Sequence, residues 1–460
     1  MTLFIHPTPL RIAIIGGGFS GTMVATHLLR LATAPLSITL IEPRPSLGAG
    51  LAYGTANPCH LLNVPAGRMS AFPDDPRHFS GWLSHDTYGA GCFAPRKLYG
   101  IYIQSVLETV IAQAPASARL DRIRNEAVAI LPHGSGAVIQ LKTGQTLQAD
   151  RVVLVLGNFP PSDPDVADRS FYRSQRYVSD PWAPDALDHL APTDPVVLVG
   201  SGLTMVDVAL TLKARGHRSA IHAISRQGRL PQSHRMSAPY PLFLTAAETP
   251  ASTRILLRRI RQEIERAAVA GYDWRAVIDA LRPETQALWQ ALPLVERRRF
   301  LRHVRSCWDV HRHRAAPKAA AAIERLKRSE QLRVHAGRID AYREQHDGVW
   351  VIYRPRRSNT LVELRASHVI NCTGPESDYR KLQHPLVRHL LASGLVRPDP
   401  LCLGLDTDAE GRLLDARGDA STFLYTLGPP CKGRLWETTA VPEIRGQAQA
   451  LAQRLLHTGG

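Results

Sequence analysis

Two glycine-rich segments, each directly after a short apolar run, constrain the fold of this 460-residue chain more than any other feature. In the first, Arg11 to Ile15 leads into Gly16-Gly17-Gly18-Phe19-Ser20-Gly21, a complete match to G-x-G-x-x-G. In the second, Val196 to Val199 leads into Gly200-Ser201-Gly202, with Met205 at the place of a third glycine. Glycine lets the backbone approach a phosphate closely because it lacks a Cβ, and a following helix N-terminus favours the negative charge. The two turns therefore indicate two nucleotide-binding units.

The surroundings of the first turn match a dinucleotide-binding unit. A helix is predicted from Thr22 to Leu31, and a strand from Ser37 to Ile41 ends in Glu42, where a ribose-binding carboxylate is expected. A tight turn without a ligand is the alternative, but the glycines, the flanking elements and the acid together favour binding. The predicted cofactor contacts of this unit are Gly16, Gly18, Phe19, Ser20, Gly21 and Glu42.

The second turn repeats this plan with a different ending. A helix is predicted from Leu203 to Ala214, and a strand from Ser219 to Ile224 ends in Ser225-Arg226 without a carboxylate. Arginine at this place can pair with a 2′-phosphate, which a carboxylate would repel, so NADPH is favoured over NADH. Met205 predicts looser packing of the helix on the strand. The predicted contacts are Gly200, Gly202 and Arg226.

An internal repeat organises the chain. After each nucleotide unit, an alternating stretch predicts a β-meander, and an apolar strand ending in glycine follows it. The two copies are Ala127 to Leu141 followed by Arg151 to Leu156, and Leu332 to Tyr353 followed by the strand before Gly374. Strands that alternate with helices imply a parallel sheet. We therefore predict an α/β fold of two doubly wound, Rossmann-like parallel-sheet domains with β-meander insertions and a helical insertion.

The expected domains follow from this order. Residues 1–160 would form the first part of one nucleotide-binding domain, and residues 367–460 its return part. Residues 161–366 would form the second domain, with a helical insertion at about 254–330 that prolines interrupt.

Composition limits the classes of protein that remain. The chain is 44% hydrophobic and 21% charged, and no apolar run approaches the roughly 18 residues of a membrane span. No signal peptide is evident at the start, so we expect a cytoplasmic protein without a membrane partner. The six cysteines form no C-x-x-C motif, which disfavours a thiol relay of electrons and predicts inert, reduced thiols.

The formal net charge of +16 raises the question of nucleic acid, but no binding module accompanies it, so no nucleic-acid partner is predicted. Arginines concentrate between 254 and 338, either as solvated helix faces or as a field that attracts anions. The segment 308–314 is either a solvated helix end or a clamp on an anion. Its histidines at i and i+2 do not share a helix face, so no metal site is predicted.

Several motifs resemble a bacterial subfamily of FAD/NAD(P)-binding flavoproteins with two dinucleotide folds. They lie at Gly48 to Tyr53, His60 to Ala66, Ser70 to Pro73, Gly202 to Asp207 and Leu435 to Arg445. The resemblance implies FAD in the first unit and NADPH or NADH in the second. It also implies that the loop from Gly48 to Asn63 runs under the isoalloxazine ring. Tyr53, Asn63, Gly374 and Gly428 are the further cofactor contacts expected on this basis, with a turn-stabilising role as the alternative for Asn63.

Within this subfamily the chain resembles the FAD-dependent urate hydroxylase type. The resemblance implies a monooxygenase that uses NAD(P)H and dioxygen to hydroxylate a small anionic substrate, with urate as the specific expectation. A flavin-dependent amine N-hydroxylase and a non-catalytic FAD/NAD(P)-binding redox protein are the alternatives. No catalytic acid or base can be assigned from the sequence.

Overall fold

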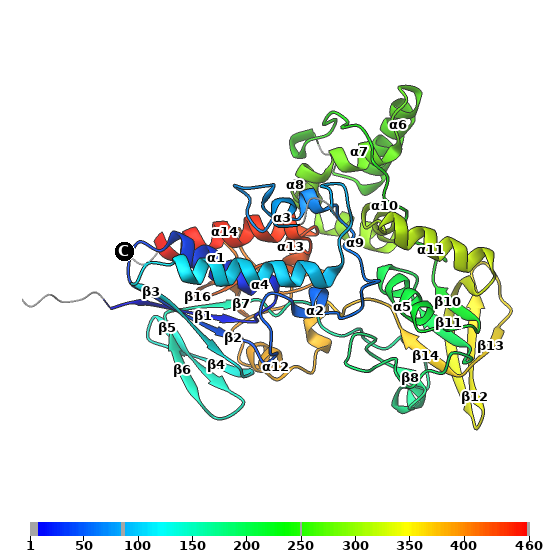
Figure 1. The fold of residues 1–460 in the computed structure, drawn as a ribbon, viewed down its shortest axis with the longest axis horizontal. Helices are drawn as coiled ribbons and strands as arrows, with labels where there is room; N and C mark the ends of the chain where they lie inside the picture. Colours follow the sequence, from blue (N-terminus) through cyan, green and yellow to red (C-terminus); the bar gives the residue numbers. More distant parts are fainter. Residues whose placement is uncertain (1–7, 84–87, 249–250, 458–460) are drawn as a thin grey trace, which may run out of the picture. The chain divides into compact units, whose positions relative to one another are not determined.

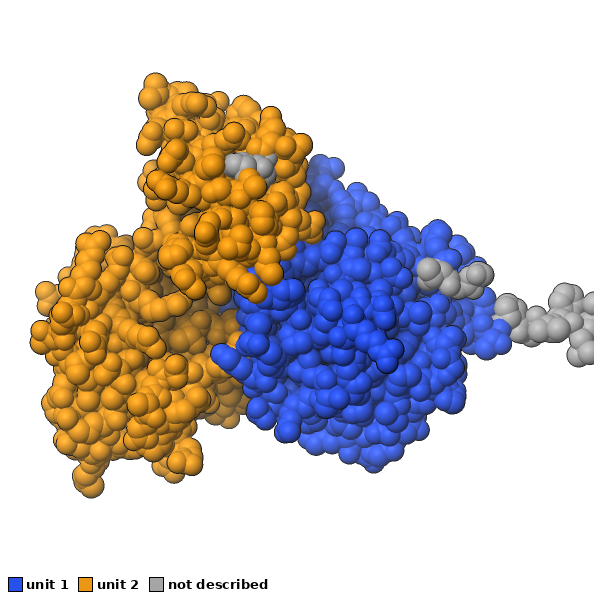
Figure 2. Space-filling model, turned by 180° about the vertical axis from the view of Figure 1, so that it is seen from behind, with its two compact units in different colours: residues 1–56, 64–159, 377–460 blue, residues 57–63, 160–376 orange. Residues whose placement is uncertain are grey.

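The computed structural model describes residues 8–83, 88–248 and 251–457. The chain divides into two compact units, coloured separately in Figure 2. Unit 1 comprises residues 1–56, 64–159 and 377–460, and unit 2 comprises residues 57–63 and 160–376.

Unit 1 is built on a six-stranded sheet in the order β15-β16-β7-β1-β2-β3. All neighbouring strands are parallel except β15 and β16, which pair in antiparallel fashion. The run Ile12 to Ile15 on the central strand is buried throughout, as expected for a strand covered on both faces. The strands are β1 Leu10–Ile15, β2 Leu36–Ile41, β3 Ala118–Ile123, β7 Arg151–Leu154, β15 Arg412–Leu414 and β16 Ala420–Thr426.

Helices cover one face of this sheet, and a separate antiparallel meander lies toward the other (Figure 1). The helices α1, α4 and α14 lie side by side, and α14 buries an apolar stripe that includes Ile444, Ala448 and Leu455. The meander shares a hydrophobic core with β7 and α12. The helices are α1 Phe19–Leu31, α2 Gly50–Tyr53, α3 His78–Trp82, α4 Arg96–Gln113, α12 Pro385–Ala392, α13 Lys432–Leu435 and α14 Val441–His457; the meander is β4 Ala127–His133, β5 Gly136–Leu141 and β6 Thr146–Ala149.

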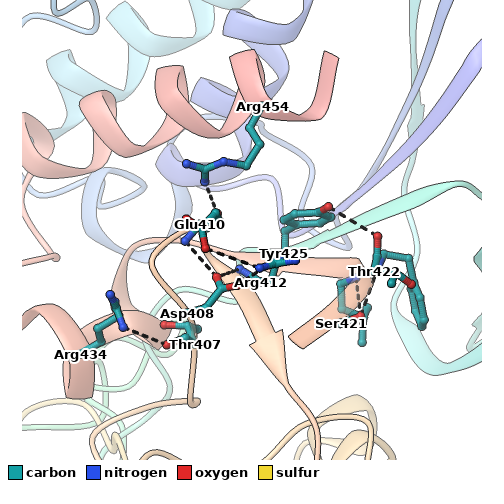
Figure 3. A network of polar contacts seen from close by, with 11 residues as sticks. Thr407, Asp408, Glu410, Arg412, Ser421, Thr422, Tyr425, Arg434 and Arg454 are labelled. Atoms are coloured by element: carbon teal, nitrogen blue, oxygen red, sulfur yellow. Dashed lines mark hydrogen bonds and ion pairs between the residues drawn. The ribbon is translucent and has the colours of Figure 1, made fainter. Parts of the chain in front are cut away.

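Arginines attach the C-terminal hairpin of unit 1 to its helices (Figure 3). Arg454 on α14 donates to the carbonyl of Glu410, and Arg434 on α13 donates to the carbonyl of Thr407. Arg412 on β15 pairs with the carboxylates of Asp408 and Glu410. These contacts hold the loop before β15 in place.

Unit 2 contains a seven-stranded sheet in the order β13-β12-β11-β10-β9-β14-β8. The long strand β11 runs parallel to β10 over its first part and antiparallel to β12 over its second, with a register shift between Ile339 and Ala341. The second meander is therefore continuous with the main sheet, whereas the first forms a sheet of its own. The strands are β8 Tyr177–Val178, β9 Val196–Val199, β10 Ile221–Ser225, β11 Leu332–Gln345, β12 Gly348–Pro355, β13 Val362–Ala366 and β14 His368–Asn371.

Seven helices occur among the described residues of unit 2, and six of them separate β10 from β11. Leu256, Ile260, Ile278 and Leu288 contribute to a small apolar core within this helical insertion. The helices are α5 Leu203–Ala214, α6 Thr253–Val269, α7 Trp274–Ala280, α8 Thr285–Ala291, α9 Leu294–His303, α10 Arg305–Arg312 and α11 Pro317–Arg328. Among the described residues, no helix combines the length and the apolar character that crossing a lipid bilayer requires.

Two unit boundaries differ from the sequence-based domains. The strand β14, which we expected to open the return to the first domain, pairs with β9 along its whole length and belongs to unit 2. The return therefore begins at residue 377 rather than 367. Residues 57–63, expected within the first domain, also belong to unit 2 because they bind helix α5.

Candidate nucleotide-binding sites

Two glycines of the first turn are required by the protein's own packing. Gly16 has a φ of +111°, and a Cβ there would collide with the carbonyl oxygen of Val155. A Cβ on Gly21 would collide with the carbonyl oxygen of Gly16. These glycines let helix α1 lie directly against the end of β1.

Gly18 differs because the space beside it is open. A Cβ built there would meet only the Cα of Gly50, at an ordinary distance of 3.5 Å. Gly18 is the N-cap of α1, no side chain caps this helix, and its first turn contains no acidic residue. The first-turn N–H groups are thus suited to an anion, so this turn fits the pyrophosphate of a dinucleotide.

Glu42 lies where the sequence predicted it, directly after β2 and beside the turn. Its carboxylate is buried and accepts hydrogen bonds from the N–H of Gly17 at 2.7 Å and of Arg44 at 3.0 Å. The acid therefore braces the glycine turn. A carboxylate offers about four lone-pair positions, so it retains acceptor capacity for a ribose hydroxyl.

Four other predicted contacts of unit 1 lie close to this turn. Phe19 and Ser20 form the first turn of α1, and the ring centroid of Phe19 is 6.1 Å from that of Tyr53. Tyr53 ends α2, and burial raises the pKa of its hydroxyl. Gly428, far along the chain, has a φ of +74°, and a Cβ there would come within 3.1 Å of Ser20 Oγ. The fold thus brings the C-terminal return to the first glycine turn.

Asn63 and Gly374 belong to unit 2 rather than to the unit with the first turn. Asn63 is half-buried, and its side-chain amide has no hydrogen-bond partner among the residues that the structure describes. It does not stabilise a turn there, so the amide is available to a ligand. Gly374 follows β14 with a φ of +90°, and a Cβ there would meet nothing within 4 Å.

In the second turn, as in the first, one glycine is required by packing and another lies beside open space. Gly200 has a φ of +113°, and a Cβ there would collide with the carbonyl oxygen of Cys372, whereas a Cβ on Gly202 would meet nothing within 4 Å. Gly202 is the N-cap of α5, without a side-chain cap or an acid in the first turn. Met205 is fully buried, so α5 leaves room for a large side chain where α1 requires glycine. This turn also fits a phosphate group.

Ser201 has a role that the sequence analysis missed. Its hydroxyl lies 2.7 Å from Ser225 Oγ and donates to the carbonyl of Arg229 at 2.6 Å. The N–H of Gly228 donates to Ser225 Oγ at 3.0 Å. These contacts fix the loop after β10, where Arg226 is exposed to solvent and free to meet a phosphate. A serine between the two glycines was the only signal in the sequence.

Helix α5 also binds the segment 57–63. Thr211 Oγ1 accepts a hydrogen bond from Asn57 Nδ2 at 2.8 Å and lies 2.9 Å from His60 Nε2. Trp182 contacts the His60 ring edge-to-face. No sequence pattern links Asn57 and His60 to Thr211, about 150 residues away, so this attachment could not be predicted.

The segment 308–314 is less exposed than a solvated helix end. Its residues 308–313 are half-buried, and Arg314 is 2% exposed and forms an ion pair with Asp279 of α7. Asp309 pairs with Arg305 at 3.4 Å.

Trp436 is a further residue that the sequence did not single out. It is buried with a φ of +59°, a strained backbone conformation of the kind that recurs at functional sites.

The fold and the two turns define an α/β protein with two Rossmann-like nucleotide-binding turns. Residues 13–159 match the family model described as FAD-NAD(P)-binding, which confirms the predicted cofactor class. In fold, the chain is similar to an ornithine N-hydroxylase of Kutzneria sp. 744, solved with FAD, NADP⁺ and L-ornithine. That comparison has a TM-score of 0.65 and 13% identity, and it covers 98% of this chain and 100% of the other. At 13% identity, this comparison establishes the fold alone.

Two relatives are similar in sequence over half of the chain. Nitrosuccinic acid synthase of Aspergillus oryzae is 28% identical over 267 residues, 51% of this chain and 41% of that protein. An L-aspartate N-monooxygenase of Streptomyces cremeus is 27% identical over 285 residues, 50% of this chain and 42% of that protein. The chain thus spans about two fifths of the length of these relatives. The comparisons do not support the urate hydroxylase subtype and favour the amine N-hydroxylase alternative.

Proposed function

We propose that the protein is an FAD- and NADPH-dependent N-monooxygenase that hydroxylates the amino group of a small amino acid. The observation that supports this most is the pair of open glycines, Gly18 and Gly202, each at an uncapped helix N-terminus in its own parallel sheet. A protein that binds a single nucleotide would need only one such open glycine turn. The N-monooxygenases among its relatives make this reaction the best match to two nucleotides and one small substrate.

The proposed reaction balances as follows: amine, dioxygen, NADPH and one proton give hydroxylamine, water and NADP⁺. Bound FAD supplies the transfer of reducing equivalents from NADPH to dioxygen. The protein's own residues bind and orient the two cofactors. Gly18 would admit the FAD pyrophosphate, Glu42 would accept from its ribose, and Gly202 would admit the phosphates of NADPH beside Arg226.

We propose an acidic amino acid as the substrate, with L-aspartate as the first candidate. Two relatives are named for nitrosuccinate formation, and one of them for L-aspartate itself. The chain's net charge of +16 suits an anionic substrate. Urate is also anionic, so charge alone does not separate the two, and a direct comparison of substrates is required.

The test is a substrate panel with FAD-loaded protein, measuring NADPH oxidation, oxygen uptake and the mass of the product. L-Aspartate, L-ornithine, L-lysine and urate are compared with succinate, which matches aspartate without its amine. An amino-acid product heavier by one oxygen atom, or the further oxidised nitro compound for which the two relatives are named, supports the proposal if it is absent with Gly18→Val. Hydroxylation of urate with every amine inert overturns it. Bound FAD without steady NADPH oxidation on any substrate would instead establish the non-catalytic alternative.

A further inference from the structure

Cys307 differs from the buried cysteines in what faces its sulfur atom. It is half-buried on α10, and its Sγ lies 3.8 Å from Nδ1 of His311, one helical turn further on. All six cysteines are free thiols. Burial raises the pKa of Cys431 to about 12 and raises that of Cys372 still further, whereas the hydrogen bond with His311 lowers the pKa of Cys307.

The geometry of His311 makes its Nδ1 a hydrogen-bond donor. Nδ1 is 2.7 Å from the carbonyl oxygen of Cys307, which can only accept. The same N–H therefore faces the sulfur, and the contact with Cys307 raises the pKa of His311. The imidazole packs edge-to-face against Trp274 of α7, with ring centroids 4.8 Å apart. This packing holds the donor in place beside the thiol.

A guanidinium reaches the thiol from another element. Arg229, on the loop after β10, lowers the pKa of Cys307 through its charge and a hydrogen bond. The carbonyl of Arg229 accepts the hydrogen bond from Ser201 in the second glycine turn. His311 on the same helix and Arg229 on this loop are thus the charged or titratable groups that face the sulfur. A half-buried thiol that faces an imidazole N–H and a guanidinium is the environment in which cysteines become reactive.

We propose that Cys307 is a redox-modification site at which hydrogen peroxide oxidises the thiolate held by His311 and Arg229 to a sulfenic acid. The sulfur attacks one peroxide oxygen, so an S–O bond forms as the O–O bond breaks and hydroxide leaves. Sulfur loses the two electrons that the peroxide gains. The guanidinium of Arg229 and the Nδ1–H of His311 stabilise the thiolate and the departing hydroxide. Only the source of peroxide within the protein, oxygen reduced without substrate hydroxylation, rests on the proposed function.

The test uses added peroxide, so it does not require a working flavin. The protein is treated with hydrogen peroxide together with dimedone, which traps sulfenic acids, and peptide mass spectrometry quantifies the label on each cysteine. Cys307 should be labelled roughly tenfold faster than Cys59, which is also half-buried. Equal rates at the two cysteines would overturn the proposal.

Two variants test whether His311 and Arg229 cause the faster labelling of Cys307. His311→Asn keeps an amide donor near the position of Nδ1 but cannot become cationic, and Arg229→Gln removes the charge of the guanidinium. Each should slow labelling of Cys307 severalfold while leaving Cys59 unchanged, and no slowing in either variant would also overturn the proposal. If a variant does not fold, the proposal is tested instead by the pH dependence of iodoacetamide alkylation in the wild-type protein. The proposal requires that Cys307 reacts at a lower pH than Cys59. Labelled Cys307 without amine hydroxylation would refute the proposed function alone.

Discussion

At the scale of single residues, the glycines of the two turns have two distinct tasks. Gly16, Gly21 and Gly200 have no room for a Cβ, since each would collide with a backbone carbonyl of the protein itself. Gly18 and Gly202 do have room, so the space beside them is open to a ligand. Stability and cofactor binding can therefore be changed separately within one motif.

Replacing Gly18 with valine should abolish FAD binding while the protein remains folded, because the branched side chain would occupy the space for the pyrophosphate. Gly21→Ala is the matched variant and should lower the free energy of unfolding by about 1–3 kcal/mol through overpacking. Visible flavin absorbance and chemical denaturation measure the two effects. A Gly18→Val protein that binds FAD normally would remove this residue from the cofactor site.

Replacing Arg226 with alanine should weaken NADPH binding by about 1.5–3 kcal/mol and leave NADH binding nearly unchanged. The reason is that this exposed arginine, at the end of β10, would pair with the 2′-phosphate that only NADPH carries. Titration of FAD-loaded protein with each coenzyme gives both affinities. Arg226→Lys should lose less NADPH affinity than Arg226→Ala. Equal weakening for the two coenzymes would refute the phosphate role.

At the scale of elements, helix α1 contains a buried histidine that makes the first unit sensitive to acid. His27 is 1% exposed, and burial, assisted by the charge of Arg30, lowers its pKa to about 4. The folded state therefore keeps the ring neutral, while the unfolded chain takes up a proton near the ordinary pKa of 6.5. The contribution of the neutral His27 ring to the free energy of unfolding is therefore complete above pH 6.5 and is lost as the pH falls toward 4.

The loss from His27 should amount to about 3 kcal/mol across this range, the free energy equivalent of the difference between the two pKa values. His27→Leu should flatten the pH dependence of the free energy of unfolding between pH 6.5 and 4. Urea denaturation at several pH values measures this. His133→Leu, on an exposed residue of β4, is the control. An unchanged slope in His27→Leu would show that other groups govern acid sensitivity.

Local patterns predicted individual elements well. The helix over Leu203–Ala214 and the strand over Val196–Val199 have the predicted bounds, because apolar periodicity and the flanking glycines define both. The sheet that a strand joins was harder to predict: β14 is largely apolar and Gly374 follows it, a pattern that suits either sheet. Contacts such as that between Cys307 and Arg229 depend on tertiary packing, so sequence patterns could not reveal them.

At the scale of the whole molecule, the two units should respond to different cofactors. A ligand present at about 100 times its dissociation constant stabilises the unit that binds it by about 2.7 kcal/mol. FAD should therefore slow hydrogen exchange in β1 and α1, and NADP⁺ should slow it in β9 and α5. Exchange measured by mass spectrometry resolves these peptides. Protection by NADP⁺ that is confined to unit 1 would contradict the assignment of the second turn.

The position of residues 57–63 has a consequence for how such a protein can evolve. The unit built around β9 and α5 is encoded by two separate stretches, because Asn57 and His60 bind Thr211 while their chain neighbours belong to unit 1. A recombination event that exchanged only residues 160–376 would replace Thr211 and leave Asn57 and His60 behind. We therefore expect viable chimaeras to inherit the short stretch and the long one from the same parent.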